Sequence, residues 1–110
     1  MLMVNYIPKY LNWEKIGKKK YYINEELYFE GEYLNGEING KGKEYSNKGI
    51  LYFEGEYRKN VRNGKGKEYN YDNGNLEFEG EYLNGERNGN GKEYYYNGNL
   101  KFEGDYLNEK

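Results

Sequence analysis

Paired carboxylates are the residues of this chain that most resemble a chemical site. Three predicted strands each carry two glutamates two positions apart on one face: Glu30 and Glu32, Glu54 and Glu56, Glu79 and Glu81. One such pair could supply general acid and base catalysis if its two carboxyls lay in different environments. Several equivalent pairs argue against catalysis. Lys41 and Lys43 lie on the predicted neighbouring strand, as do Lys65 and Lys67 in the next copy. Cross-strand charge pairing on a solvated face therefore explains both sets.

Composition removes most other catalytic chemistry. The 110-residue chain contains no cysteine and no histidine, and its only serine is Ser46. Thiolate metal sites, disulfide frameworks and Ser-His-Asp or Cys-His nucleophiles are therefore impossible. We expect no catalytic residues, no bound metal and no cofactor, and hence a protein that is not an enzyme. The absence of cysteine fits a reducing compartment, and we expect a cytoplasmic protein.

Charge is distributed unevenly along the chain. Residues 1–24 carry five lysines and one glutamate, which gives +4, whereas the remainder carries 12 basic and 18 acidic residues, which gives -6. The run Lys18 to Lys20, with Trp13 and Tyr21 nearby, could contact phosphates on lipid or nucleic acid. The acidic remainder argues against nucleic acid, and anionic lipid stays open. The preferred interpretation is a basic end that complements the acidic repeats.

Two short phrases recur at a nearly constant spacing. FEG(E/D)Y starts at residues 29, 53, 78 and 102, in steps of 24, 25 and 24, and NGxGKEY starts at Asn39, Asn63 and Asn88. Both phrases lengthen at the same place, because one extra residue lies between Tyr69 and Phe78. Extra residues are tolerated in turns. A fixed period whose single irregularity falls in a predicted turn indicates a repeat architecture.

Each repeat is predicted to form a β-hairpin. Aromatic residues favour strands, and Asn-Gly pairs favour tight hairpin turns. The first strand of each hairpin is predicted at 27–34, 51–58, 76–83 and 100–107, and the second is GKGKEY. The predicted fold is all-β: a single-layer antiparallel meander of stacked β-hairpin repeats, elongated and curved.

Alternation along the first strand separates a core face from a polar face. Each unit contributes one phenylalanine, one glycine and one tyrosine to the predicted core. One unit cannot bury these groups alone, so stacked neighbours must share them. The predicted core residues are Phe29, Gly31 and Tyr33; Phe53, Gly55 and Tyr57; Phe78, Gly80 and Tyr82; and Phe102, Gly104 and Tyr106.

The N-terminal segment differs from the repeats. Residues 1–17 do not match the pattern and are predicted to cap the first strand, because an uncovered sheet edge invites pairing. Residues 18–110 form the predicted repeat domain of about 3.5 units, starting near 29, 53, 78 and 102. Self-association through the sheet edges stays open. A second open hypothesis is that the chain is a fragment of a longer repeat array.

A row of tyrosines is the predicted binding surface. Tyr21, Tyr45, Tyr69 and Tyr94 occupy equivalent positions in the repeat, and Tyr96 lies close to the last of them. A row of such rings can serve as a rigid platform for a protein partner. The alternative is that each ring only packs inside the repeat. A single-layer sheet cannot bury both faces, so part of the row should be exposed.

FEGEYLNGERNGNGKEY, from Phe78 to Tyr94, resembles the MORN repeat (membrane occupation and recognition nexus). The resemblance covers roughly residues 18–110, although the usual unit has 23 residues and often carries Trp where Tyr33, Tyr57, Tyr82 and Tyr106 stand. It implies an elongated sheet of hairpins that binds or organises other proteins, without catalytic residues. The 24-residue step and YYYNGNLKFEG are similar to the bacterial YwqK-like subgroup, which implies an antitoxin-like role with a toxin or effector as partner.

Three other functions stay open. Phospholipid binding was proposed for the MORN family, and Tyr- and Gly-rich hairpin repeats also occur in proteins that bind cell-wall carbohydrate. Carbohydrate-binding repeats usually carry one Trp per unit, whereas this chain has only Trp13. The third alternative is a structural spacer.

Overall fold

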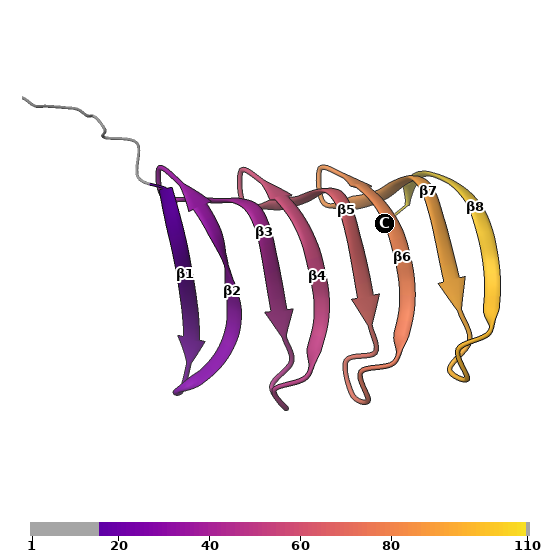
Figure 1. Cartoon of the computed structure of the whole chain (residues 1–110), viewed down its shortest axis with the longest axis horizontal. Helices are drawn as coiled ribbons and strands as arrows, with labels where there is room; N and C mark the ends of the chain where they lie inside the picture. Colours follow the sequence, from indigo (N-terminus) through magenta and orange to yellow (C-terminus); the bar gives the residue numbers. More distant parts are fainter. Residues whose placement is uncertain (1–15, 110) are drawn as a thin grey trace, which may run out of the picture.

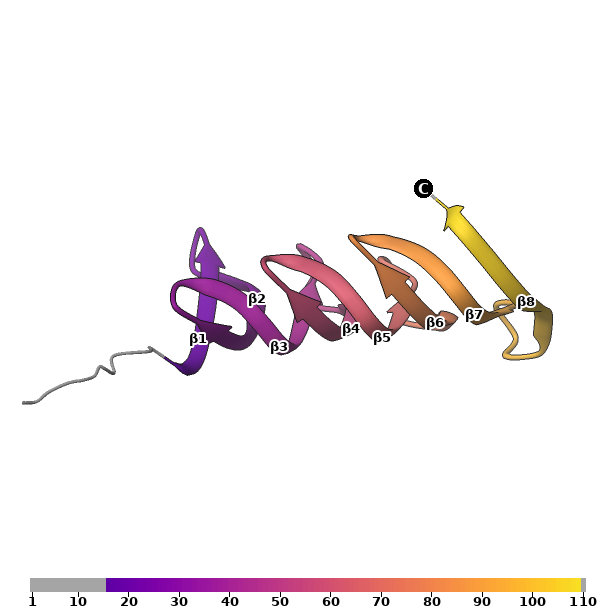
Figure 2. The same ribbon diagram turned by 90° about the horizontal axis from the view of Figure 1, so that it is seen from above.

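The computed structural model describes residues 16–109 and the side chains of residues 16–107. They form eight strands in one antiparallel sheet, whose spatial order is the order along the chain (Figure 1). The sheet does not close on itself, and β1 and β8 lie at its opposite ends (Figure 2). The predicted all-β meander of hairpins is confirmed. The strands are β1 (Ile16–Ile23), β2 (Glu26–Leu34), β3 (Glu37–Tyr45), β4 (Leu51–Arg58), β5 (Val61–Tyr69), β6 (Leu76–Leu83), β7 (Glu86–Tyr94) and β8 (Leu100–Glu109).

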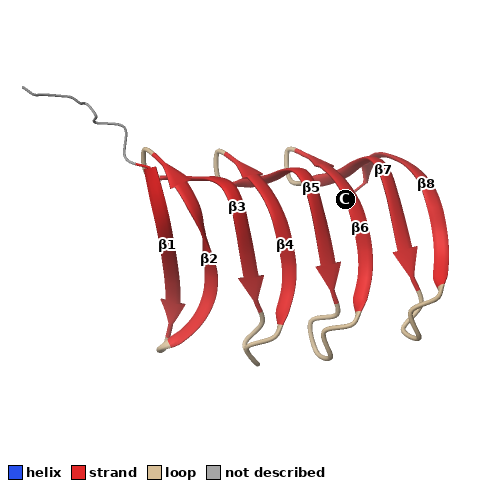
Figure 3. Cartoon of the chain, viewed as in Figure 1, coloured by secondary structure: helices blue, strands red, loops and turns tan. Residues whose placement is uncertain are grey.

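A tight turn joins β1 to β2, and from β2 onward tight turns alternate with longer connections (Figure 3). In each tight turn both residues have positive φ, as type I′ hairpins require. The tight turns are Asn24-Glu25, Asn35-Gly36, Lys59-Asn60 and Asn84-Gly85. The longer connections span residues 46–50, 70–75 and 95–99. The extra residue of the second repeat lies in 70–75, so the predicted insertion in a turn is confirmed.

The second strand of each hairpin starts earlier than the sequence pattern predicted. β3 begins at Glu37, three residues before the predicted start at Gly40. Gly40 has a φ of 110° and lies at a β-bulge, not in the turn. The bulge leaves the backbone N–H of Lys41 without a ladder partner, and this group donates to Glu32 Oε1 at 2.8 Å. The side chain of Glu32 thus lets the ladder continue past the bulge.

The core is a ladder of aromatic rings that crosses from each repeat to the next. Phe53 and Phe78 are fully buried, and Tyr57, Tyr82 and Tyr106 are 5–6% exposed. Each phenylalanine packs edge-on against the tyrosine of the following repeat: Phe29 on Tyr57 at 5.4 Å, Phe53 on Tyr82 at 5.3 Å, and Phe78 on Tyr106 at 5.3 Å between centroids. Such pairs contribute about 0.5–1.5 kcal/mol beyond the area they bury.

Facing glycines let these rings lie directly on the backbone. A methyl group added at Gly55 would lie 2.6 Å from Cα of Gly66 and 2.9 Å from the ring of Phe53. The ends of the ladder are looser. Tyr33 is only half-buried, and Phe102 on the last strand is 44% exposed. The predicted core is therefore tightly packed in the middle repeats and open at both ends.

The predicted N-terminal cap lies mostly outside the described residues. Of residues 1–17, the structure describes only Ile16 and Gly17, which belong to β1. Gly17 pairs with Tyr33 in the register that Gly40 has with Tyr57. β1 thus extends the repeat pattern by one strand at the N-terminal side.

Replacing Phe53 with alanine should destabilise the fold by about 3–5 kcal/mol, because the ring is fully buried between two repeats. Urea unfolding followed by circular dichroism measures this free energy. Phe102→Ala is the matched control, since it removes the equivalent ring where 44% of it is exposed. If the two variants lose the same free energy of unfolding, the packing of rings between repeats does not stabilise the fold as proposed.

Gly64→Ala should cost clearly more stability than Gly98→Ala. Both glycines have positive φ, 114° and 92°, so both variants carry the backbone strain, above about 1 kcal/mol. Only at Gly64 would the added methyl group also collide with the Glu56 carboxylate, whereas nothing lies within 4 Å of it at Gly98. The difference in melting temperature between the two variants measures what the close contact at the bulge contributes to stability. Identical melting curves would show that this contact contributes nothing.

Candidate functional site

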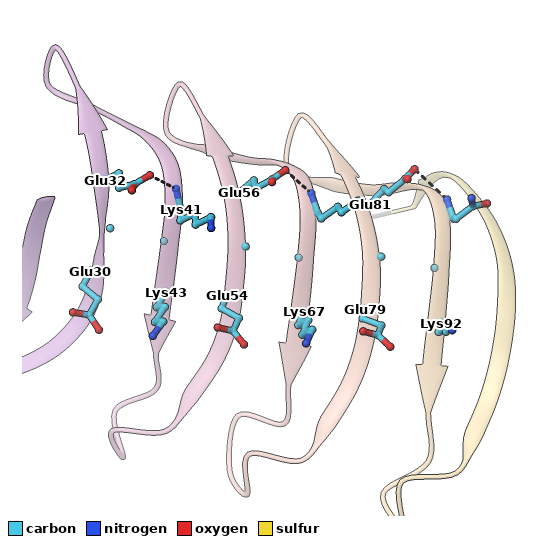
Figure 4. Close-up of a pocket in the computed structure, with 18 of the residues that line it drawn as sticks. Glu30, Glu32, Lys41, Lys43, Glu54, Glu56, Lys67, Glu79, Glu81 and Lys92 are labelled. Carbon is cyan, nitrogen blue, oxygen red and sulfur yellow. Dashed lines mark hydrogen bonds between the residues drawn. The ribbon is translucent and has the colours of Figure 1, made fainter. Parts of the chain in front are cut away.

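An open groove of about 1100 Å³ runs along the face of the sheet opposite the core (Figure 4). We call this side the groove face and the other the core face. The residues that line the groove come from every strand, from Lys18 on β1 to Gly104 on β8. The glycines of the core ladder form the floor of the groove. The space that a Cβ atom would occupy at these glycines lies on the core face and is filled there by aromatic rings.

Two rows of charged side chains flank the glycine floor, and the sign alternates along each row (Figure 4). The alternation follows from the register, since Lys43 pairs with Glu30 on one side and with Glu54 on the other. The first row is Lys20, Glu30, Lys43, Glu54, Lys67, Glu79, Lys92 and Glu103. The second row is Lys18, Glu32, Lys41, Glu56, Lys65, Glu81 and Asn90.

The glutamates of the first row accept hydrogen bonds from tyrosines. The hydroxyl of Tyr45 donates to Glu30 at 2.6 Å, and that of Tyr69 donates to Glu54 at 2.5 Å. Tyr94 repeats the contact with Glu79. The tyrosines predicted as a binding row and the paired carboxylates, which the sequence presented as separate candidates, thus form one surface.

The glutamates of the second row accept hydrogen bonds from the backbone at the bulges. Glu56 Oε1 binds the N–H of Lys65 at 2.9 Å, as Glu32 binds that of Lys41. Each glutamate of a predicted pair therefore has its own structural partner, and the arrangement repeats from unit to unit. This regularity supports a structural role for the pairs rather than acid and base catalysis.

The predicted charge pairing between lysines and glutamates is only partly correct. The register places them opposite each other, but among the described residues Lys41, Lys43, Lys65 and Lys67 make no ion pair within 4.0 Å. The carboxylates turn toward tyrosine hydroxyls and backbone N–H groups, which compete for the same oxygens. The lysine side chains are exposed, so their ammonium groups can contact a ligand or partner.

Three of the five predicted binding tyrosines border the groove. Tyr45, Tyr69 and Tyr94 are half-buried there, whereas Tyr96 is 85% exposed in the 95–99 connection. Tyr21 lies on the core face, where its ring centroid is 5.8 Å from that of Phe29.

The sequence spacing misplaced Tyr21 by one position. Lys20 and Lys43 both pair with Glu30, so Tyr22 rather than Tyr21 is the structural equivalent of Tyr45. Counting a full 24-residue step back from Tyr45 overlooked this, because the step between these two strands is 23 residues. The exposed Tyr22 is therefore the member of the row that sequence reasoning missed.

The tyrosines of the groove keep their protons at neutral pH. Partial burial and the contact with Glu30 raise the pKa of Tyr45 to about 12, and burial and Glu54 do the same for Tyr69. The hydrogen bond to Glu79 raises the pKa of Tyr94. A tyrosine that acts as a base or nucleophile needs a lowered pKa. These hydroxyls act as hydrogen-bond donors that fix the row in place.

A second charged cluster lies on the core face and was not predicted. Arg62 Nε and Nη2 both donate to the carboxylate of Glu44 at 3.1 Å, and the hydroxyl of Tyr57 donates to the same carboxylate. The guanidinium lies 3.9 Å from the ring centroid of Phe53. Bidentate pairing and cation–π contact fix Arg62 over the core. We call this group a clamp.

The next repeat contains a second clamp. Arg87 donates to Glu68 at 3.1 and 2.9 Å and lies 4.1 Å from the ring centroid of Phe78. The hydroxyl of Tyr82 also donates to Glu68. In the first repeat Ile38 takes the arginine position and packs against the core. The glutamate that recurs in each Lys-Glu-Tyr end of the NGxGKEY phrase was the sequence signal for the clamps. That signal did not indicate which residue pairs with the glutamate.

The clamp lowers the pKa of its glutamate. Burial alone would raise the pKa of Glu44, but the hydrogen bonds from Arg62 and Tyr57 outweigh burial. Arg87 and Tyr82 do the same for Glu68. Both carboxylates are therefore ionised at neutral pH, and each joins adjacent repeats.

Within 16–109, no group of three or more histidine, cysteine, aspartate or glutamate residues could hold a metal ion. In the same part of the chain, no helix is long and apolar enough to cross a membrane.

Comparison with known proteins gives one family match. The family model described as MORN repeat matches residues 29–50, 53–75 and 78–100, which together exceed half of the chain. Each matched segment begins at a core phenylalanine and covers most of one hairpin with its following connection. No curated protein matches the chain.

Glu44→Gln should destabilise the protein at neutral pH by about 1–3 kcal/mol, because the partly buried guanidinium of Arg62 loses its charged partner. The substitution should also reduce the loss of folding free energy that occurs as pH falls below neutrality. The folded pKa lies below the ordinary value of 4.5, so this stabilisation is present above pH 4.5 and is lost as pH falls through the folded pKa.

Urea unfolding between pH 7 and pH 3 tests both effects. Glu37→Gln, at an exposed position, is the matched control and should leave the curve nearly unchanged. If Glu44→Gln and Glu37→Gln give the same curve, the clamp does not contribute to stability.

Proposed function

This chain belongs to the MORN repeat family, whose repeats are generally non-catalytic binding modules, and on that premise we propose that it binds a protein partner along its groove face. One observation carries the proposal. A single groove spans all eight strands and presents exposed lysines beside glutamates that already accept hydrogen bonds. A regular surface of this length suits an extended segment better than a small ligand.

The chemistry of the groove favours an acidic segment of the partner. Lys43, Lys67 and Lys92 are exposed and can pair with carboxylates of the partner. The tyrosine rings beside them supply apolar contact area at one border. Their hydroxyls are already fixed by Glu30, Glu54 and Glu79, so binding would order few new side-chain rotors.

The partner class that we propose is a toxin or effector protein of the cytoplasm. This rests on the similarity of the 24-residue step and of YYYNGNLKFEG, Tyr94 to Gly104, to the YwqK-like subgroup. A groove that follows the whole ribbon could cover a long segment of such a protein. An antitoxin-like role requires nothing more than tight binding, and no catalytic residue is needed for it.

Reversing three groove charges should weaken partner capture by roughly tenfold or more. The variant is Lys43→Glu, Lys67→Glu and Lys92→Glu, and the matched control is Arg58→Glu, Lys59→Glu and Lys101→Glu, which changes charge equally outside the groove lining. Affinity capture from the native source with quantitative mass spectrometry gives the readout, and melting curves verify folding.

A second variant tests the tyrosine border. Tyr45→Ala, Tyr69→Ala and Tyr94→Ala should also reduce capture, because they remove rings beside the groove and the hydroxyls that hold the glutamates of its first row. Undiminished capture by both folded groove variants would exclude the groove as the binding surface. Binding to anionic liposomes or to a glycan array, lost in the lysine variant, would instead identify lipid or carbohydrate as the ligand.

A further inference from the structure

We infer that this chain associates head to tail with further copies of itself, with β8 of one copy pairing to β1 of the next. The inference does not depend on the proposed partner. It rests on the two end strands, which the sheet order leaves with one neighbour each among the described residues: β2 for β1 and β7 for β8. Unpaired N–H and C=O groups along such edges are a template for another strand.

The strand directions are compatible with this joint. Neighbouring strands alternate in direction throughout the sheet, so an odd-numbered strand placed after β8 continues the antiparallel order. β1 also has the register of a repeat strand. It pairs with β2 as β3 pairs with β4: Lys20 and Lys43 each face the first glutamate, and Gly17 and Gly40 each face the tyrosine.

The charges at the two edges are complementary in that register. Inside the sheet, Glu30 pairs with Lys43, Glu54 with Lys67, and Glu79 with Lys92. Glu103 occupies the corresponding position on β8 and Asp105 follows it, but the described chain provides no later strand to face them. β1 of a second copy would place Lys20 opposite Glu103 and Lys18 beside Asp105, which continues both charged rows of the groove.

The core face of β8 is also incomplete. The rings of Phe29, Phe53 and Phe78 each lie against a glycine of the following strand, where an added methyl group would lie 2.6–2.8 Å from the ring. Phe102 has no such strand in the described chain and is 44% exposed. In the joint, Lys19 of the next copy takes the glycine position.

Lys19 should make this joint weaker than the internal ones. Its ammonium already lies 4.5 Å from the ring centroid of Tyr33, so its stem can lie over an aromatic ring. It nevertheless occupies space that Gly42, Gly66 and Gly91 leave free, so Phe102 must move. The association should therefore be reversible.

Other pairings of the edges place like charges together. Two β8 strands would oppose Glu103 and Asp105 to the same residues of the other copy, and two β1 strands would oppose lysines. A joint between two different surfaces at opposite ends of the molecule produces linear chains of copies, or a ring where the rotation between successive copies closes. The predicted cap of residues 1–17 would occupy the same edge of β1, and the two ideas exclude each other.

Sedimentation of the purified 110-residue chain tests the inference. The average mass should exceed 13.2 kDa, rise with protein concentration and fall with added salt. A mass of 13.2 kDa at all concentrations would overturn the inference and favour the cap. Because only purified chain is present, this outcome is separate from success or failure of partner capture.

Three variants test the register of the joint. Lys19→Gly restores the glycine of the internal strands and should lower the concentration for half-association by roughly tenfold. Lys18→Glu with Lys20→Glu, and separately Glu103→Lys with Asp105→Lys, should each abolish self-association. An equimolar mixture of these two charge variants should restore it, because each then meets an edge of opposite sign. Failure of the mixture to associate, or no gain from Lys19→Gly, would overturn the proposed joint.

Discussion

A single-layer sheet has no second layer to cover its core, and this constraint shapes the whole structure. Phe53 is nevertheless fully buried. Its ring lies against Gly55 of its own strand and Gly66 of β5, packs on Tyr82 of the next repeat and is covered by the guanidinium of Arg62. Burial is thus supplied by the following repeat, so stability depends on stacking. The exposed ring of Phe102 shows what a repeat loses when no further strand follows it in the described chain.

The groove is a consequence of the same arrangement. The glycines make room for the aromatic rings on the core face, and on the groove face only their backbone is present. The residues that alternate with these glycines along each strand point into solvent on the groove face. Those residues are glutamates and lysines that alternate along each row, except at Asn90, and each row repeats the register of the ladder. Tyrosines at one border and backbone N–H groups at the bulges fix the carboxylates. The surface is regular because the core beneath it is regular.

Much of the fold could be predicted from local patterns. The repeat period, the Asn-Gly turns and the position of the extra residue all agree with the structure, since each depends on residues close in sequence. The start of β3 at Glu37 was missed, because Asn39-Gly40 has the composition of a turn but forms a bulge that Glu32 stabilises. Tyr21 was placed on the wrong face for a related reason: spacing alone did not reveal that the first step is one residue shorter.

The sequence by itself determined which face most strand residues occupy, because side chains alternate along a strand wherever no bulge interrupts it. Tyr21, beside a bulge of β1, is the exception. Only the tertiary structure decided which groups the charged residues contact. Glu30 turns to Tyr45, 15 residues away, rather than to the opposing Lys43, and Glu44 turns to Arg62, 18 residues away. Such choices are a competition among donors that stacking brings to the same oxygen. A sequence pattern shows only which residues are close along the chain. It does not show which donor binds a given carboxylate oxygen in the folded protein.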